Sequence, residues 1–214
     1  ILPGSSIKRV YDECVPRYEK LYDDTIKLMA AGFEKLATNI NTSGMKNPQV
    51  VFNTLNWERK EWIKADEKWQ KVTVPSVGYK AIEIKNSDDS FNVAASDANL
   101  ENDLLKVELN EDGFISSIWD KELEREIVPE NYSANQLAVY YDEGDAWDMP
   151  LDYAETTPQL MKLESRDFSV DGPKAVLTQK FKLGFSILEQ KIELTQGSRR
   201  IDFETAGTWR ETKS

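Results

Sequence analysis

The sequence contains no histidine, and this absence removes several kinds of chemistry. Without an imidazole the chain cannot form a Ser-His or Cys-His nucleophile pair, and it lacks the commonest general base and metal ligand. Any catalysis by this chain would depend on carboxylates, Tyr, Lys or Arg. The only cysteine, Cys14, excludes a disulfide within the chain. Such low cysteine use favours a reducing compartment and a cytoplasmic location.

Positive charge and long apolar runs are also scarce. Lys and Arg number 27 against 38 Asp and Glu, so the net charge is −11. This balance argues against a nucleic-acid partner, because such proteins neutralise phosphates with basic surfaces. No apolar run approaches the roughly 18–20 residues of a membrane helix, and the first residues lack the order of a signal peptide. We therefore expect no membrane partner. The chain opens on Ile1 rather than Met, which is consistent with a domain of a longer protein.

Acidic residues are concentrated in one part of the chain. Residues 97–171 carry 20 acidic and 5 basic side chains. Two interpretations remain open for this stretch. It could be a solvated face that serves solubility, or a cleft that takes a neutral or cationic ligand.

The first part of the sequence has the pattern of a long helix. Apolar residues recur every three to four positions between residues 7 and 37, which predicts one apolar stripe. Pro16 is expected to kink or divide this helix, because its ring removes one backbone hydrogen bond and crowds the preceding turn. No second helix is predicted to pair with the stripe. It would therefore be exposed unless it lies on the rest of the chain or on missing segments.

From Asn47 the apolar period changes to two, which predicts strands and a mainly β fold. The expected strands are Val50–Asn53, Glu61–Lys64, Lys71–Val74, Tyr79–Ile84, Leu104–Leu109, Phe114–Trp119, Asn135–Tyr141, Met161–Val170, Ala175–Leu183, Ile187–Leu194 and Arg200–Thr205. Turn residues between the later runs indicate antiparallel hairpins in a β-sandwich. We predict a helical segment at 1–44, a small antiparallel β-domain and linker at 45–96, with Asn86–Asn99 as the linker, and a large β-sandwich at 97–214.

The strongest candidate for a site is the acidic and aromatic stretch from Tyr140 to Tyr153. Aromatic rings stack on the C–H faces of sugars and carboxylates accept hydrogen bonds from hydroxyls, so this composition suits a saccharide. The spacing does not match a calcium loop, and one segment cannot fix the carboxylate separation that glycoside hydrolysis needs. From the residues alone, a loop without a role and a ligand contact both remain open. A second cluster, Trp57, Trp62 and Trp69, is better explained as hairpin and core packing than as ligand stacking.

Several motifs, in order along the chain, resemble the carboxyl-terminal half of glycoside hydrolase family 38 α-mannosidases of the bacterial and cytosolic type. They are Ile1–Ile7, Val51–Trp57, Val74–Tyr79, Leu100–Val107, Gly113–Lys121, Asn135–Leu137, Asp145–Asp148 and Arg200–Thr205, the last followed by Trp209. The resemblance implies a much longer enzyme. Its amino-terminal α/β barrel would carry the catalytic Asp and most zinc ligands, followed by a helical bundle and β-domains that end in a mutarotase-like supersandwich.

The resemblance places no catalytic residue and no metal ligand on this chain, so zinc is expected only as a cofactor of the parent enzyme. It implies that Asp145, Trp147 and Asp148 approach the substrate cleft. Tyr141 and Tyr153 are further substrate-binding candidates. The expected partners are a mannoside substrate and the catalytic barrel of the same parent chain, together with a possible second copy of the protein.

Two functions from different classes follow. The first is a carboxyl-terminal segment of a zinc-dependent retaining α-mannosidase that supports the barrel, helps shape the cleft and is inactive alone. The second is a free-standing carbohydrate-binding or interaction β-sandwich. An exposed apolar stripe on the 7–37 helix and an unpaired edge strand near 200–210 would favour the first function.

Overall fold

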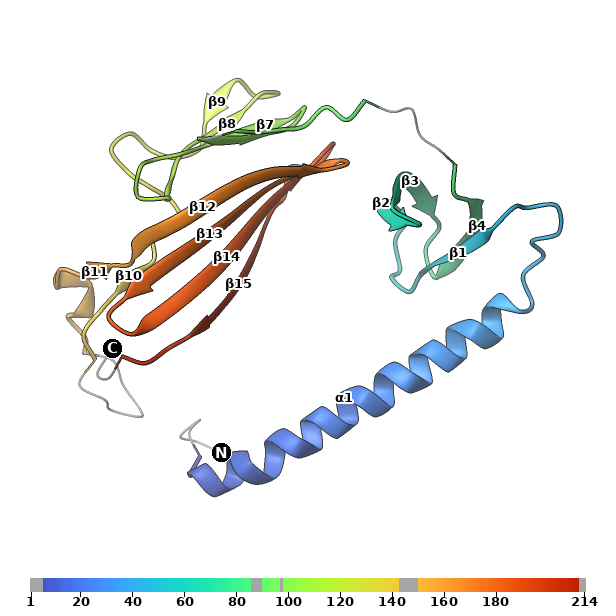
Figure 1. Ribbon diagram of the computed structural model, residues 1–214, viewed down its shortest axis with the longest axis horizontal. Helices are drawn as coiled ribbons and strands as arrows, with labels where there is room; N and C mark the ends of the chain where they lie inside the picture. The colour runs from blue at the N-terminus through green and yellow to red at the C-terminus, as the bar shows by residue number, and fades with distance from the viewer. Residues whose placement is uncertain (1–5, 86–89, 97, 143–149, 212–214) are drawn as a thin grey trace. The chain divides into compact units, whose positions relative to one another are not determined.

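The computed structural model describes residues 6–85, 90–96, 98–142 and 150–211, and the chain divides into two compact units, Ile1–Asp88 and Asp89–Ser214 (Figure 1). One long helix is followed only by antiparallel strands and one short 3₁₀ helix among the described residues. The expected mainly β fold with an amino-terminal helix is confirmed. The finer division at residues 44 and 96 stays a prediction.

The first unit begins with α1 (Lys8–Ala37), a single uninterrupted helix that contains Pro16. Pro16 therefore does not divide the helix, because the turns on either side keep their own hydrogen bonds and only one bond is lost. None of the residues of α1 is buried. Tyr18, Leu21 and Leu28 on the apolar stripe are 70%, 61% and 75% exposed, so the strands of the first unit leave most of the stripe uncovered.

Four short strands complete this unit. They are β1 (Pro48–Asn53), which pairs with β4 (Gly78–Glu83), and β2 (Arg59–Ala65), which pairs with β3 (Lys68–Val74). Their buried residues Val72, Val74 and Ile82 form a small core, against which Val51 and Ile63 pack. Alternate residues of β3 are buried, as the period of two predicts.

The second unit contains two sheets that pack face to face. The first is a five-stranded sheet of β5 (Ala94–Ser96), β6 (Asn99–Glu101), β7 (Leu105–Leu109), β8 (Ile115–Asp120) and β9 (Arg125–Glu126). The second is a four-stranded sheet of β12 (Lys162–Asp171), β13 (Lys174–Leu183), β14 (Ser186–Thr195) and β15 (Ile201–Thr208). In Figure 1 the green strands β7 and β8 lie over the orange strands of the second sheet.

The main core lies between these sheets. Leu100, Val107 and Ile115 from the first sheet pack with Leu177 and Ile192 from the second, and each is at most 1% exposed. Residues of alternate positions on each strand therefore meet across the interior, which is the arrangement of a β-sandwich. The predicted sandwich is confirmed.

A second apolar cluster, formed by Phe114, Met161 and Phe181, lies on the same four-stranded sheet. It is covered by a two-stranded ribbon of β10 (Ala138–Val139) and β11 (Gln159–Leu160), which flank the 3₁₀ helix η1 (Tyr153–Glu155) in the sequence. Only two residues of the predicted strand Asn135–Tyr141 are in a strand. The predicted linker Asn86–Asn99 is also wrong at its carboxyl end, because β5 and the start of β6 add to the sheet there.

Candidate functional site

The acidic and aromatic stretch predicted as a site follows β10 and ends at η1. Asp145, Trp147 and Asp148 lie outside the described residues. The other two predicted residues are described: Tyr141 is 58% exposed and Tyr153 is 39% exposed. Both side chains are therefore exposed to solvent, and their contact with a substrate stays a prediction.

The described ends of this stretch are held together by aromatic packing. The ring of Tyr153 meets the ring of Tyr140 edge to face, with 5.4 Å between centroids and an interplanar angle of 84°. Such geometry is favoured because the positive ring edge meets the negative ring face. The ring contact that the structure shows for Tyr153 is with Tyr140 and not with the predicted Tyr141. Sequence reasoning missed this role of Tyr140, although its position at the end of a strand was visible.

The stretch is anchored to the sandwich on both sides. Ala138 pairs with Leu160, and the backbone N–H of Met161 donates to the carbonyl oxygen of Leu137 at 2.9 Å. Met161 is 2% exposed and packs with Phe114 and Phe181. The β10–β11 pair and Met161 thus form a buried and hydrogen-bonded stem at the base of the stretch. Aromatic rings next to such a fixed stem can offer a stacking surface to a sugar.

The groups whose pKa values shift lie elsewhere in the sandwich and have structural partners. Burial raises the pKa of Glu126, but hydrogen bonds from Ser117 and from the N–H groups of Ile118, Val128 and Ile127 outweigh it, so the pKa is lowered. The hydrogen bond from the Lys106 ammonium to Glu108 raises the pKa of Lys106. Both pKa shifts are explained by structural contacts: the Lys106–Glu108 ion pair and the hydrogen bonds that Glu126 accepts at the end of a strand. Over residues 6–85, 90–96, 98–142 and 150–211, no group of three His, Cys, Asp or Glu side chains could hold a metal ion.

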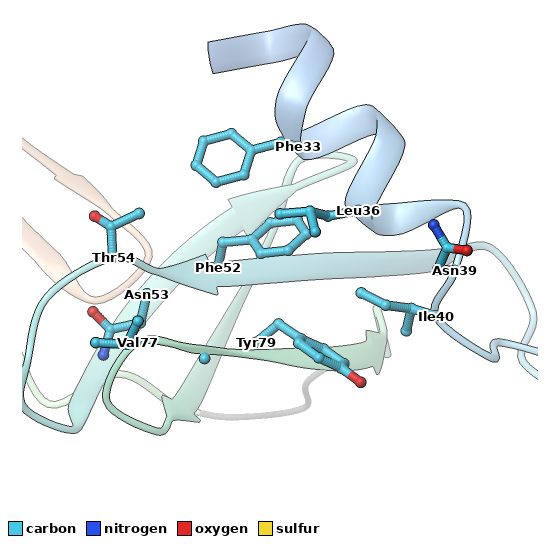
Figure 2. Close-up of a pocket in the computed structure, with 10 residues that line it drawn as sticks. Phe33, Leu36, Asn39, Ile40, Phe52, Asn53, Thr54, Val77 and Tyr79 are labelled. Carbon is cyan, nitrogen blue, oxygen red and sulfur yellow. The ribbon is translucent and has the colours of Figure 1, made fainter.

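The first unit contains an apolar pocket that the sequence did not predict (Figure 2). It has a volume of about 450 Å³ and is lined by residues near the end of α1 and by the β1–β4 pair. The ring of Phe33 stacks on Phe52 with centroids 4.8 Å apart, and Phe52 lies 6.2 Å from Tyr79. Helical spacing predicted that Phe33 lies on the apolar stripe, and strand alternation predicted an inward-facing side chain at Phe52. Neither pattern could predict that the two rings would be in contact.

Asn53, one of the polar side chains that line this pocket, holds the surrounding backbone in place. Asn53 is 4% exposed, and its amide donates to the carbonyl oxygens of Trp57 and Pro75 at 2.7 and 2.9 Å. Its own oxygen accepts the N–H of Leu55 at 3.1 Å. The pocket therefore offers a ligand mainly apolar surface and the edge of Tyr79, which suits packing against apolar side chains better than chemistry.

Two of the three tryptophans predicted to pack in a hairpin, Trp62 and Trp69, do contact side chains of the β2–β3 hairpin. The ammonium groups of Lys71 and Lys64 lie over the rings of Trp62 and Trp69, at 5.4 and 5.7 Å from their centroids. Trp57, in contrast, is 57% exposed. The first two rings are thus partly covered by lysine side chains of the β2–β3 hairpin.

Among the described residues, no helix is both long enough and apolar enough to cross a membrane.

Comparison with known proteins gives consistent relatives. The model of the glycosyl hydrolases family 38 C-terminal domain matches residues 100–214. The chain is 25% identical to human alpha-mannosidase 2C1 over 234 residues, which cover 99% of this chain and 22% of that protein. It is 24% identical to alpha-mannosidase G of Dictyostelium discoideum over 172 residues, which cover 65% of this chain and 15% of that protein.

A solved structure shares the fold. The crystal structure of an alpha-mannosidase from Enterococcus faecalis V583 superposes with a TM-score of 0.67 over 94% of this chain and 34% of that one, at 15% identity. The chain spans about a fifth of the length of the human relative. Because the family model covers more than half of the chain, this protein belongs to glycosyl hydrolase family 38 and contains its C-terminal domain.

Proposed function

We propose that this chain is a carboxyl-terminal part of a zinc-dependent retaining α-mannosidase, in which it supports the catalytic barrel and helps shape the substrate cleft. The match of residues 100–214 to the family 38 C-terminal domain carries this proposal. Hydrolysis with retention needs a carboxylate nucleophile and a second carboxylate that acts as acid and base. We assign neither role to this chain, and we place zinc on residues outside it, because zinc needs several N, S or O donors at one point.

The exposed face of α1 supports the view that this chain packs on other parts of an enzyme. At about 100° per residue, the apolar positions from Leu28 through Tyr18 to Ile26 cover roughly 160° of the helix circumference. This is wider than the seam needed for one partner helix. We therefore propose that α1 packs between two further helices of a bundle, as helices do in bundles with an interior core.

Asp145, Trp147, Asp148, Tyr141 and Tyr153 are the proposed substrate-facing residues. The accessible rings of Tyr141 and Tyr153 on an anchored stem support this assignment. Their task would be to bind sugar hydroxyls and C–H faces, which affects substrate affinity more than the chemical step.

The test compares the 214-residue chain with the longer protein that contains it, using hydrolysis of a chromogenic α-mannoside with added zinc. We expect hydrolysis only by the longer protein, with the anomeric configuration retained when product is followed by proton NMR. Zinc-dependent hydrolysis by the 214-residue chain alone would contradict the proposal that the catalytic residues and the zinc ligands lie outside this chain.

A second test concerns the proposed substrate-facing residues. In the longer protein, Trp147→Ala and Asp145→Asn are expected to lower kcat/KM by about ten-fold or more, mainly through KM, which corresponds to about 1.4 kcal/mol of lost binding. Glu130→Gln, an exposed carboxylate outside this stretch, is the matched control. An unchanged KM in both variants would show that the Tyr140–Tyr153 stretch does not contact the substrate.

The alternative of a free-standing carbohydrate-binding or interaction module has less support. Such a module should cover its own apolar faces, whereas α1 exposes its stripe and, within the described residues, β15 ends a sheet with one unpaired edge. A cytoplasmic location and self-association stay expectations. Fractionation of cells that express the longer protein would test the location.

A further inference from the structure

The outer face of the four-stranded sheet, which points away from the sandwich core, contains a hollow of about 490 Å³. It is lined by Lys180, Phe185, Ile187, Glu189, residues 206–208 and Arg210. The hollow lies where the β13–β14 hairpin turns and β15 ends. It shares no residue with the Tyr140–Tyr153 stretch or with the pocket in the first unit.

The two walls of the hollow are tied to each other. The Glu211 carboxylate accepts the N–H groups of Phe185 and Ser186 at 2.9 and 3.2 Å, and the Ser186 hydroxyl at 3.0 Å. The N–H of Arg210 donates to the same hydroxyl at 2.8 Å. Ser186 is fully buried, and a Cβ on Gly184 would come within 2.7 Å of the Glu211 carboxylate. The backbone that presents Phe185 and Arg210 is therefore fixed before any ligand binds.

The side chains at this hollow are unusual for so acidic a protein. The ring of Phe185 is 82% exposed although its backbone is fixed, which places an apolar face at the rim. By strand alternation, Lys162 and Lys182 lie on the same face as Lys180, where Glu164 pairs with Lys180 at 3.2 Å and with Lys182 at 3.8 Å. With Arg210, four cations lie near three carboxylates, Glu164, Glu189 and the hydrogen-bonded Glu211. This end of the face is locally positive although the net charge of the chain is −11.

We propose that this hollow is a binding site for a monosaccharide unit that bears a negative group, such as a phosphate or a carboxylate. The guanidinium of Arg210 and the ammonium of Lys180 would bind the anionic group, because charge-assisted hydrogen bonds are the strongest available there. Phe185 would stack on the C–H face of the ring, and the Glu189 carboxylate would accept hydrogen bonds from sugar hydroxyls. The volume suits a single sugar unit or two.

A sugar fits these observations better than a simple anion does. A bare phosphate needs only the cations, whereas the fixed exposed ring and the carboxylate of Glu189 would contribute nothing to its binding or oppose it. A neutral sugar would leave Arg210 unused. The combination of one ring, one acceptor and two cations therefore selects for a ligand that has both a hydroxylated ring and a charge.

The experiment titrates the 214-residue chain with mannose 6-phosphate, glucuronic acid, mannose and inorganic phosphate, following backbone amide shifts by NMR and affinity by calorimetry. We expect at least one anionic sugar to bind about ten-fold more tightly than mannose and than inorganic phosphate, with shifts at residues 185–187 and 206–210. The two anionic sugars distinguish a phosphate from a carboxylate as the preferred charge.

The variants separate the two kinds of contact. Arg210→Gln should weaken binding of the anionic sugar about ten-fold, and Phe185→Ala should weaken it while leaving inorganic phosphate unchanged. Arg125→Gln, an exposed arginine on β9, is the matched control. Equal affinity for phosphate and the anionic sugars, or affinity that is unchanged in Arg210→Gln, would overturn the proposal. So would self-association of the chain that the same two variants abolish, because it would make the face a protein interface.

Discussion

Asn102 shows how one buried side chain can join two sheets. It is 2% exposed, and its amide donates to the carbonyl oxygens of Thr195 and Ser198 at 2.7 and 2.8 Å. Its oxygen accepts the N–H groups of Leu104 and Leu105 at 2.8 and 2.7 Å. The turn between β6 and β7 is thereby tied to the turn between β14 and β15.

Asn102→Ala is expected to lower the free energy of unfolding by about 2–4 kcal/mol, because it leaves two carbonyls and two N–H groups buried without their partner. Urea unfolding followed by tryptophan fluorescence would measure the loss. The control is Asn92→Ala, an exposed asparagine of the same unit. A loss below about 0.5 kcal/mol in Asn102→Ala would show that other groups hold the turns together.

Glu193 is the centre of an ion-pair network on the outer face. Its carboxylate binds the ammonium groups of Lys174 and Lys191 at 2.8 and 2.7 Å. Burial raises the pKa of Glu193, but the hydrogen bonds from the two lysines outweigh it, so the pKa lies below its ordinary value of 4.5. The hydrogen bond to Glu193 also raises the pKa of Lys191 above 10.5.

These directions set a pH dependence. Because the folded pKa of Glu193 is lowered, its ionised form stabilises the fold fully above about pH 4.5. That contribution is lost as the pH falls from there through the folded pKa. Glu193→Gln should therefore cost about 0.5–1 kcal/mol at pH 7, where the network is intact and partly exposed, and progressively less below pH 4.5.

The check is thermal unfolding of both proteins between pH 2.5 and 7, with Glu111→Gln, an exposed turn residue, as the control. The stability difference between the original chain and Glu193→Gln should shrink towards low pH. A difference that stays constant from pH 7 to pH 2.5 would mean that the charge of Glu193 does not contribute.

At the scale of elements, α1 is the part whose surface least suits water. Its apolar stripe is exposed over most of its length, apart from the contact of Phe33 with Phe52, and its polar face carries i,i+4 pairs such as Lys8–Asp12 at 2.7 Å and Arg9–Glu13 at 2.8 Å. Such pairs stabilise an exposed helix by only about 0.3–0.5 kcal/mol each. Packing of the stripe must supply most of the stability that keeps α1 helical.

The 214-residue chain is therefore expected to self-associate through this stripe. Tyr18→Glu should reduce the association constant about ten-fold or more, since it places a charge at the centre of an apolar contact. Ala31→Glu makes the same change on the polar face and should leave association unchanged. Sedimentation equilibrium measures both, and equal effects of the two substitutions would show that the stripe is not the contact surface.

At the scale of the whole molecule, the two units differ in how much core they contain. Among the residues that the structure describes, the main buried cluster of the sandwich has ten members, whereas the buried cluster of the first unit has three. Because stability follows the apolar area removed from water, the first unit should unfold at a lower temperature. Two transitions are expected in calorimetry.

Asn102→Ala offers a way to assign these transitions. It lies in the sandwich, so it should lower only the upper transition and leave the lower one in place. If a single transition appears and moves as a whole in Asn102→Ala, the two units unfold together.

Much of the fold could be predicted because it depends on local pattern. The period of three to four residues predicted the start of α1 to within one residue, and alternation predicted most strands of the four-stranded sheet. The short strands β5 and β6 were not predicted, because three residues each are too few to show a period. They form because β6 pairs with β7 and β5 pairs with β6. Of the candidate site, the sequence identified the stretch and its rings but not the contact between Tyr140 and Tyr153.

The sequence by itself determined the secondary-structure pattern, the absence of imidazole chemistry and, through motifs in order, the family. Each of these depends on residue type or on neighbours along the chain. Only the tertiary structure decided which distant groups meet, as with Asn102 and Thr195, which are 93 positions apart, or Lys180, Phe185 and Arg210 around one hollow. Strand pairing and sheet packing bring such groups together, and no local period encodes a contact between residues that far apart.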